Sequence, residues 1–264
     1  MAHFAELDEN KTVLRKLRDF EKKYLKSIFS RIYIKILDYI LVKSFPNNFN
    51  IYYEKKTINY LSSLCDKYGT DKGFQEKPSR QFYDWDPHTY ADFYSQLFDH
   101  CRFDIKKVFE CGIGSDNPKV ISAMGSRYIP GSSLRVWRDY FENAQIYGAD
   151  VDKDIMFSEE RIKTFYVDQT DKVSIAKMWN DINETDFDLI IDDGLHTFQA
   201  GCCLWENSFG RLKKNGIYII EDNSYAHILE VKDYFNKKNV KFEIITLNSS
   251  LGFHSNNNLF LIRK

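Results

Sequence analysis

The chain has 264 residues, of which 37 are basic and 38 acidic, so its formal net charge is −1. Apolar residues make up 43% and charged residues 28%. These proportions are close to the globular average, and they exclude a chain that is disordered throughout. The near-neutral charge also removes the argument for nucleic acid that an excess of Lys and Arg would make. The length suits one large domain, or one domain with an appendage.

Cysteine usage and hydropathy predict a cytoplasmic protein. The five cysteines form no CxxC pair and leave an odd thiol, and the acidic start does not resemble a secretory signal, so we expect a reducing compartment. The most apolar stretch, Ile32–Val42, is interrupted by Lys35 and Asp38 and falls short of the roughly 20 residues that span a bilayer. We therefore expect no stable membrane insertion.

The first hundred residues divide into a helical and an irregular part. Residues 10–43 have helical character, and Pro46–Asn50 is predicted to be a loop. Residues 54–102 are predicted to be irregular, with a turn at Tyr68–Gly73 and a ring-rich run at Phe82–Tyr90. A helix should follow from Tyr90 to about residue 100. We expect residues 1–60 to be a helical extension for subunit or substrate contacts, and residues 61–264 to be one domain with a core at 105–264.

The rest of the chain is regular. Six runs rich in β-branched and aromatic residues alternate with helix-like stretches, and a short final run follows a turn-rich segment. The runs are Lys107–Cys111, Gln145–Asp150, Ile162–Val167, Phe187–Asp192, Gly216–Ile220, Lys241–Leu247 and Asn258–Lys264. This pattern predicts an α/β, Rossmann-like sheet of seven strands. The last strand should be antiparallel, because no crossover helix fits before it.

In such a sheet, ligands bind outside the carboxyl ends of the strands. Gly112 and Gly114 follow the first strand and allow a tight turn, while Glu110 could hold an ammonium group. Asp150, at the end of the second strand, is placed to accept hydrogen bonds from a ribose hydroxyl pair. Asp168 and Gln169, after the third strand, are placed to border an adenine. A structural turn and helix N-caps are the alternative interpretations.

The fourth and fifth strands end in the acids Asp192, Asp193, Glu221 and Asp222. Neighbouring strands lie about 5 Å apart, so these carboxylates would repel one another unless a divalent cation held them. Oxygen ligands favour Mg²⁺. We predict Asp193, Glu221 and Asp222 as metal ligands, with Asp192 turned aside, and His196 as a general base in the same cavity. The alternative is that the acids cap the following helices.

The ordered motifs of the chain resemble the macrolide-sugar O-methyltransferases, a group of class I S-adenosylmethionine-dependent methyltransferases. The similarity spans about residues 61–223. The motifs are Tyr68–Gly73, Glu110–Gly114, Pro130–Phe141, Tyr147–Asp150, Val167–Asp171, Ile191–His196 and Gly216–Asp222. Leu195 and Asn223 depart from the residues usual at these positions, and the chain before residue 61 does not match.

The resemblance implies S-adenosylmethionine as methyl donor and Mg²⁺ bound at Asp193, Glu221 and Asp222. It also implies that His196 is the base, with Asp193 beside it in the catalytic site, and that the protein is a homo-oligomer. The donor-binding candidates are Tyr68, Thr70, Lys72, Glu110, Gly112, Gly114, Asp150, Asp168, Gln169 and Asp192. His88, in the ring-rich run, is a candidate for lining the substrate.

We expect methyl transfer to a hydroxyl of a sugar, nucleotide sugar or glycan precursor. One alternative keeps the fold and the donor but methylates a phosphate-type oxygen or an amine in bacterial capsule or surface-glycan biosynthesis. A second alternative is a non-catalytic, Rossmann-like binding module.

Overall fold

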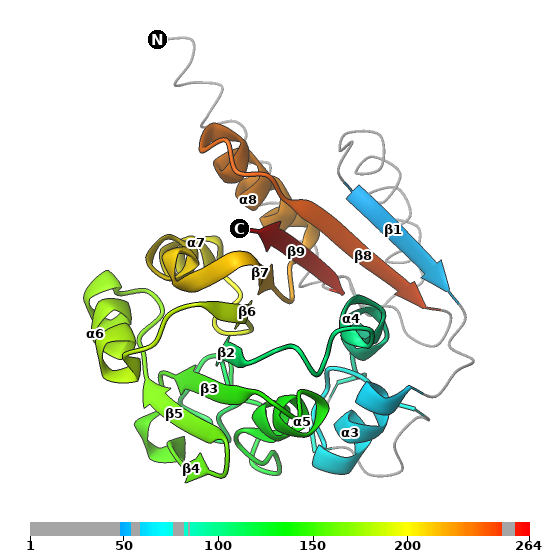
Figure 1. The fold of residues 1–264 in the computed structure, drawn as a ribbon, viewed down its shortest axis with the longest axis vertical. Coiled ribbons are helices and arrows are strands. Elements are labelled where there is room, and N and C mark those ends of the chain that lie inside the picture. Colours follow the sequence, from blue (N-terminus) through cyan, green and yellow to red (C-terminus); the bar gives the residue numbers. More distant parts are fainter. Residues whose placement is uncertain (1–47, 54–58, 76–81, 84, 250–256) are drawn as a thin grey trace.

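The computed structural model describes residues 48–53, 59–75, 82–83, 85–249 and 257–264. Within these ranges one nine-stranded sheet has the order β1-β8-β9-β7-β6-β2-β3-β5-β4 (Figure 1). The strands are β1 (Asn48–Tyr53), β2 (Lys107–Cys111), β3 (Gln145–Asp150), β4 (Ser158–Glu159), β5 (Ile162–Tyr166), β6 (Phe187–Asp192), β7 (Leu212–Ile220), β8 (Glu243–Ser249) and β9 (Asn258–Arg263). The helices are α3 (Tyr60–Tyr68), α4 (Tyr90–Phe98), α5 (Ser132–Tyr140), α6 (Lys172–Ile182), α7 (Phe198–Ser208) and α8 (Tyr225–Lys237), with 3₁₀ turns at Lys153–Ile155 and Phe209–Arg211.

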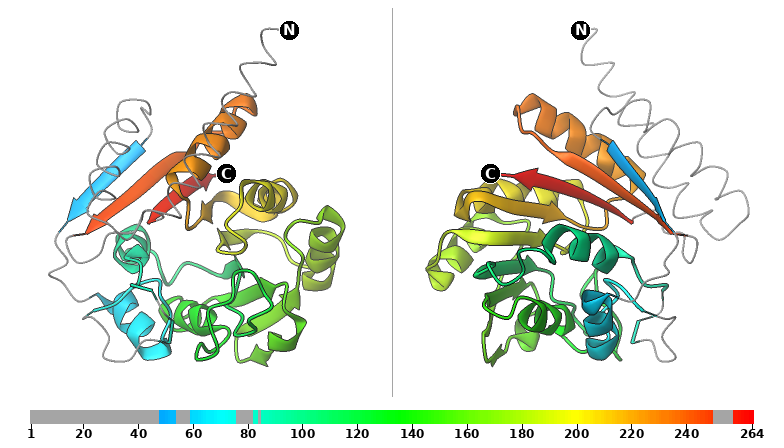
Figure 2. Two further views of the ribbon diagram at one scale, coloured as in Figure 1. Left: turned by 180° about the vertical axis from the view of Figure 1, so that it is seen from behind. Right: turned by 45° about the vertical axis from the view of Figure 1, so that its right-hand side comes forward.

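Helices cover both faces of the sheet. Helices α3, α4 and α5 pack on one face and α6, α7 and α8 on the other (Figure 1 and Figure 2). Side chains alternate between the two cores along each strand, so in β2 Val108 joins the first core and Phe109 the second. Because both faces are buried, the inner strands are apolar at nearly every position. The result is a three-layer α/β/α domain.

The seven predicted strands are all present, and their directions are confirmed. Strands β5, β3, β2, β6 and β7 are parallel neighbours, while β9 runs antiparallel to both β7 and β8. The sequence order reverses on either side of β2, which leaves a crevice outside the carboxyl ends of β2 and β6. This is the position at which an open α/β sheet binds its ligands.

Three predictions of local structure are wrong. The loop expected at Pro46–Asn50 gives way from Asn48 onward to β1, which pairs in parallel with β8 at the sheet edge. The connection from β3 to β5 contains a 3₁₀ turn and the short strand β4 in place of a helix. Helix α3 lies in the zone expected to be irregular. The helix expected at residues 10–43 lies outside the described residues.

Helix α3 positions the turn that follows it. The helix begins with a reciprocal cap, in which the Asn59 side chain accepts from the backbone N–H of Ser62, and the Ser62 hydroxyl accepts from that of Asn59. It ends at Gly69, whose φ of 76° suits a left-handed C-cap. The backbone carbonyls of Asp71 and Lys72 then accept hydrogen bonds from His88 and Ala91. The turn is thereby fixed over the end of the sheet.

No helix within the described ranges has both the length and the apolar character that a membrane crossing requires.

Candidate active site

A cleft of about 340 Å³ opens at the carboxyl ends of β2, β3, β6 and β7. Its size is typical of small-molecule sites. Seven of the residues predicted from the sequence line it: His88, Gly112, Gly114, Asp150, Asp193, His196 and Asp222. The far wall carries Asp71, Trp85 and His88, which belong to the turn after α3 and to the segment before α4. The cleft thus joins the predicted donor loop to the predicted acid cluster.

The glycine loop after β2 is shaped by close backbone contacts. Gly112 has a φ of 87°, and a Cβ atom there would lie 2.1 Å from the backbone oxygen of Asp193. Gly114 has a φ of 79°, and its Cβ would lie 2.3 Å from the ring of Tyr128. A side chain at either position would meet both a strained backbone and a steric clash. Gly112 therefore allows the loop after β2 to approach the loop after β6, and Gly114 allows it to pack against the ring of Tyr128.

Asp150 is held by the glycine loop. Its carboxylate accepts hydrogen bonds from the backbone N–H of Ile113 at 2.9 Å and of Asp152 at 3.0 Å. Burial raises the pKa of Asp150, although these hydrogen bonds oppose the shift. Each carboxylate oxygen has a second lone pair, so Asp150 can still accept from hydroxyl groups of a ligand in the cleft.

Asp193, His196 and Asp222 form a cluster on the opposite side of the cleft. Each offers one ligand atom, and these atoms lie within 4.8 Å of one another. His196 and Asp222 have φ values of 52° and 55°, in the left-handed region that residues other than glycine seldom adopt. Such backbone conformations concentrate at functional sites, where the surrounding structure holds them in place.

Asp222 is the most heavily contacted acid of this cluster. Its Oδ1 accepts from the Tyr90 hydroxyl at 2.6 Å and lies 3.3 Å from His88 Nε2, while its Oδ2 lies 3.7 Å from His196 Nε2. Burial by itself raises the pKa of Asp222, but the two imidazoles and the Tyr90 hydroxyl together lower it below its usual value. Asp222 is therefore a carboxylate at neutral pH.

A buried ion cluster, which the sequence did not predict, lies behind the cleft. Lys72 Nζ lies 2.7 Å from Asp193, 3.1 Å from Glu110 and 2.5 Å from Glu221. The side chain of Lys72 is only 3% exposed. Burial alone would lower the pKa of Lys72, but the three carboxylates raise it well above its usual value. Lys72 is therefore a charged ammonium among the acids.

Glu110 and Glu221 face this ammonium rather than the cleft. Glu110 is fully buried and also accepts from the Trp137 indole at 2.8 Å. Glu221 accepts from the Tyr94 hydroxyl at 2.5 Å. Both oxygens of Glu221 are thus engaged, and Glu221 lies outside the cluster of Asp193, His196 and Asp222. The structure brings two of the three predicted metal ligands together, with His196 beside them.

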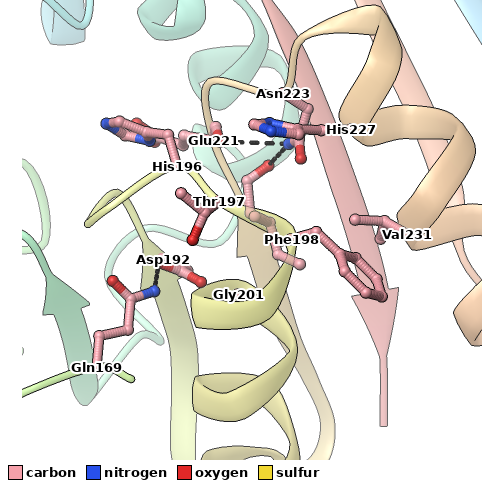
Figure 3. A pocket seen from close by; sticks show the side chains of 11 residues that line it. Gln169, Asp192, His196, Thr197, Phe198, Gly201, Glu221, Asn223, His227 and Val231 are labelled. Carbon is pink, nitrogen blue, oxygen red and sulfur yellow. Dashed lines mark hydrogen bonds between the residues drawn. The ribbon is translucent and has the colours of Figure 1, made fainter. Parts of the chain in front are cut away.

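The structure does not bring several predicted donor-binding residues to the cleft. Tyr68 donates to Asp139 on α5 at 2.5 Å, and Thr70 is buried beside Tyr128. Asp168 accepts from the backbone and hydroxyl of Thr170. Gln169 and Asp192 line a separate cavity of about 20 Å³ near the start of α7, where they face each other (Figure 3).

The donor atoms of this cluster fit a metal ion. Two carboxylates and one imidazole within 4.8 Å of one another form a donor set that suits a divalent cation. Asp193 and Asp222 supply the oxygen ligands that Mg²⁺ prefers. Glu221 can join them only if its carboxylate leaves Lys72 or Tyr94. The residues present therefore fit the predicted ion through Asp193 and Asp222.

The known proteins that the chain resembles are methyltransferases. No protein-family model matches the chain. The chain is 32% identical to 8-demethyl-8-alpha-L-rhamnosyl tetracenomycin-C 2'-O-methyltransferase of Streptomyces olivaceus over 163 residues, which are 61% of this chain and 37% of that protein. It is 29% identical to mycinamicin VI 2''-O-methyltransferase of Micromonospora griseorubida over 164 residues, or 61% and 35% of the two chains.

Among solved structures, the MycE methyltransferase of the mycinamycin biosynthetic pathway, in complex with Mg and SAH, superposes with a TM-score of 0.53. It is 24% identical to this chain, and the match covers 78% of this chain and 55% of MycE. The chain has the fold of class I methyltransferases. It resembles sugar O-methyltransferases in sequence, as predicted, and it spans about a third of the length of the curated relatives it matches.

Proposed function

We propose that this chain is an S-adenosylmethionine-dependent O-methyltransferase that acts, with a divalent cation such as Mg²⁺, on a hydroxyl of a sugar or a similar small polar acceptor. One observation carries the proposal. A single cleft joins the glycine loop and Asp150 to the cluster of Asp193, His196 and Asp222. The names of the relatives support the same reaction, because two of them are sugar O-methyltransferases.

In this proposal the glycine loop and Asp150 bind the donor. Gly112 and Gly114 line the cleft and carry no side chain, which leaves room for the ligand there, and Asp150 accepts from its hydroxyls. S-adenosylmethionine carries the methyl group on a sulfonium sulfur, which leaves readily because it departs as a neutral thioether. Transfer forms an O–CH₃ bond as the S–CH₃ bond breaks, and it leaves S-adenosylhomocysteine.

Asp193 and Asp222 would hold the divalent cation, with Glu221 as the third predicted ligand. Such an ion supplies positive charge that lowers the pKa of a neighbouring hydroxyl. His196 takes the acceptor proton in this proposal. The imidazole is 31% exposed toward the cleft, and its contact with Asp222 orients it. Asp222, as a carboxylate, stabilises the imidazolium that results.

The five cysteines are free thiols, which supports the further proposal that the protein acts in a reducing compartment such as the cytoplasm. Assembly into a homo-oligomer is likewise proposed, on the resemblance alone.

A labelled-methyl assay tests the proposed function. The purified chain is incubated with S-adenosylmethionine, Mg²⁺ and a panel of rhamnosides, nucleotide sugars and glycan precursors, and the products are analysed by mass spectrometry. We expect a product heavier by one methyl group, and we expect EDTA to abolish its formation. Calorimetry with S-adenosylhomocysteine is the parallel measurement. Absence of binding there, together with absence of product, would contradict the proposal.

A further inference from the structure

The loop between β6 and α7 carries both Asp193 and His196, and one side chain holds its two ends. Gln169 Nε2 donates to Asp192 Oδ1 at 2.6 Å, and Gln169 Oε1 accepts from the backbone N–H of Leu195 at 2.9 Å. Figure 3 shows the first of these hydrogen bonds beside the start of α7. The amide thus spans the residue before Asp193 and the residue before His196.

The loop is also constrained on its other sides. The backbone N–H of Asp193 donates to the carbonyl of Cys111 at 2.8 Å, and that of Glu221 donates to the carbonyl of Asp192 at 2.9 Å. Gly194 lies against Gln169 so closely that a Cβ at this position would be 2.1 Å from Oε1. These contacts hold the loop at Asp192, Asp193 and Leu195, and the next residue, His196, has a left-handed φ.

We propose that Gln169 is a positioning residue, which fixes Asp193 and His196 for the reaction through Asp192 and Leu195. The inference rests on the proposed function, and it gives Gln169 a role other than the contact with adenine that the sequence predicts. Gln169 is 7% exposed, both its polar groups are engaged with the loop, and it lines the small cavity rather than the cleft.

The chemistry of the loop requires an amide at this position. Asp192 needs a donor facing Oδ1, and the N–H of Leu195 needs an acceptor. A glutamine side chain supplies one of each. A glutamate would keep the acceptor but place a second carboxylate against Asp192, whose 3% exposure leaves little water to screen the repulsion.

This requirement suggests a test in which the amide of Gln169 and the carboxylate of Asp192 are exchanged. Q169E should break the contact with Asp192. The double variant Q169E/D192N should restore it, because the new amide at position 192 donates to the new carboxylate, which still accepts from Leu195. D192N alone keeps an oxygen that can face Gln169, and its effect should be smaller than that of Q169E. Circular dichroism confirms that each variant is folded, and Q169N, which is neutral but one methylene shorter, replaces Q169E if that variant unfolds.

Three measurements follow the loop directly. The first is the imidazole resonance of His196 in ¹³C-histidine-labelled protein, assigned by its loss in H196Q. The second is the affinity for Mn²⁺ by electron paramagnetic resonance, and the third is the affinity for S-adenosylhomocysteine by calorimetry. We expect Q169E to shift the resonance and weaken Mn²⁺ binding about tenfold or more, with a change of less than about twofold for S-adenosylhomocysteine. In the double variant Q169E/D192N, the His196 resonance and the Mn²⁺ affinity should return toward their native values.

The inference is overturned if the His196 resonance in folded Q169E stays at its native position, or if the double variant is no closer to native than Q169E. A loss of S-adenosylhomocysteine affinity equal to the loss of Mn²⁺ affinity would assign Gln169 to the donor instead. If the native protein binds neither ligand, the proposed function fails. The resonance needs no ligand and still decides whether Gln169 positions the loop.

Discussion

His196 is the residue on which the proposed proton transfer depends, because its imidazole faces the cleft next to Asp222. H196A should lower the rate of methyl transfer by about 10²–10⁴-fold, the range typical of a general base. Binding of S-adenosylhomocysteine, measured by calorimetry, should be unchanged. H100A, at an exposed position outside the cleft, is the control. Full turnover in H196A would point to an acceptor that is already ionised.

Lys72 stabilises the fold through contacts with three carboxylates, of which Glu110 and Glu221 are buried. K72M would leave Glu110, Asp193 and Glu221 without their shared cation, and loss of one partner from a buried ion cluster costs about 3–5 kcal/mol. We expect a loss of that size in urea unfolding with EDTA present. K177M removes an exposed helical ion pair with Asp181 and should cost less than about 0.5 kcal/mol.

Mg²⁺ should also stabilise K72M more than it stabilises the native chain. Three uncompensated carboxylates attract a divalent cation, so Mg²⁺ should raise the melting temperature of K72M by more than it raises that of the native chain. Equal shifts in the two proteins would show that Lys72 and the metal do not share ligands.

The sequence predicts the acids at the strand ends but not the ion pairs that some of them form with Lys72. Asp150, Asp193 and Asp222 follow apolar runs, and the carboxyl ends of parallel strands meet at one edge, so their proximity could be inferred. Lys72 is 121 residues from Asp193 and 149 from Glu221, and only the packing of α3 and α4 on the sheet brings them together. No local pattern carries that information. The hydrogen bond between Gln169 and Leu195, 26 residues away, likewise depends on the tertiary fold.

Helices α3 and α5 are joined by Asp139, which shows how ionisation stabilises one element against another. Asp139 accepts from Tyr68 at 2.5 Å, Lys67 at 2.9 Å and Arg138 at 2.9 Å. Burial raises the pKa of Asp139, but these three hydrogen bonds outweigh it and lower the value to about 2. Because this folded-state value lies below the unfolded one, the unfolded chain binds more protons between about pH 4 and pH 2.

The stabilisation by Asp139 is therefore present above about pH 4 and is lost as the pH falls toward 2. A shift of this size corresponds to about 2 kcal/mol. D139N should be less stable than the native chain by about that amount at pH 6, and the difference in urea unfolding should narrow at pH 3. A difference that stays constant over this range would refute the assignment. Y68F should weaken the same contact between α3 and α5. It should leave S-adenosylhomocysteine binding intact, since Tyr68 faces Asp139.

The elements that the sequence failed to predict depend on their neighbours. Pro46 precedes strand β1 by two residues and two asparagines lie within the strand, and these residues locally favour a turn. The segment is a strand because β8 offers it an edge. Helix α3 is short, and its Asn59 and Ser62 cap lacks the Glu or Gln that marks a capping box in sequence. The buried strands β2, β3 and β6 were predicted with their observed bounds, because long apolar runs need no such context.

At the scale of the whole molecule, β1 extends the sheet beyond the seven strands of the predicted core. Among the described strands it pairs only with β8, and β8 pairs with β9 on its other side. Removal of β1 would leave β8 as an open edge, and an unprotected edge strand invites pairing between chains. The seven-stranded core should still fold, since the cleft and the described core residues all come from later elements.

Two truncations separate β1 from the chain that precedes it. Deletion of residues 1–47 keeps β1, and deletion of residues 1–54 removes it. Loss of several ladder hydrogen bonds, each with a small net contribution, should make the second protein less stable than the first by about 2–4 kcal/mol, or roughly 4–12 °C in melting temperature. Light scattering should show more association in the shorter protein, while S-adenosylhomocysteine binding should be equal in both. Equal melting temperatures would mean that β1 adds nothing to the stability of the sheet. A loss of S-adenosylhomocysteine binding only in the shorter protein would mean that β1 supports the cleft as well as the edge.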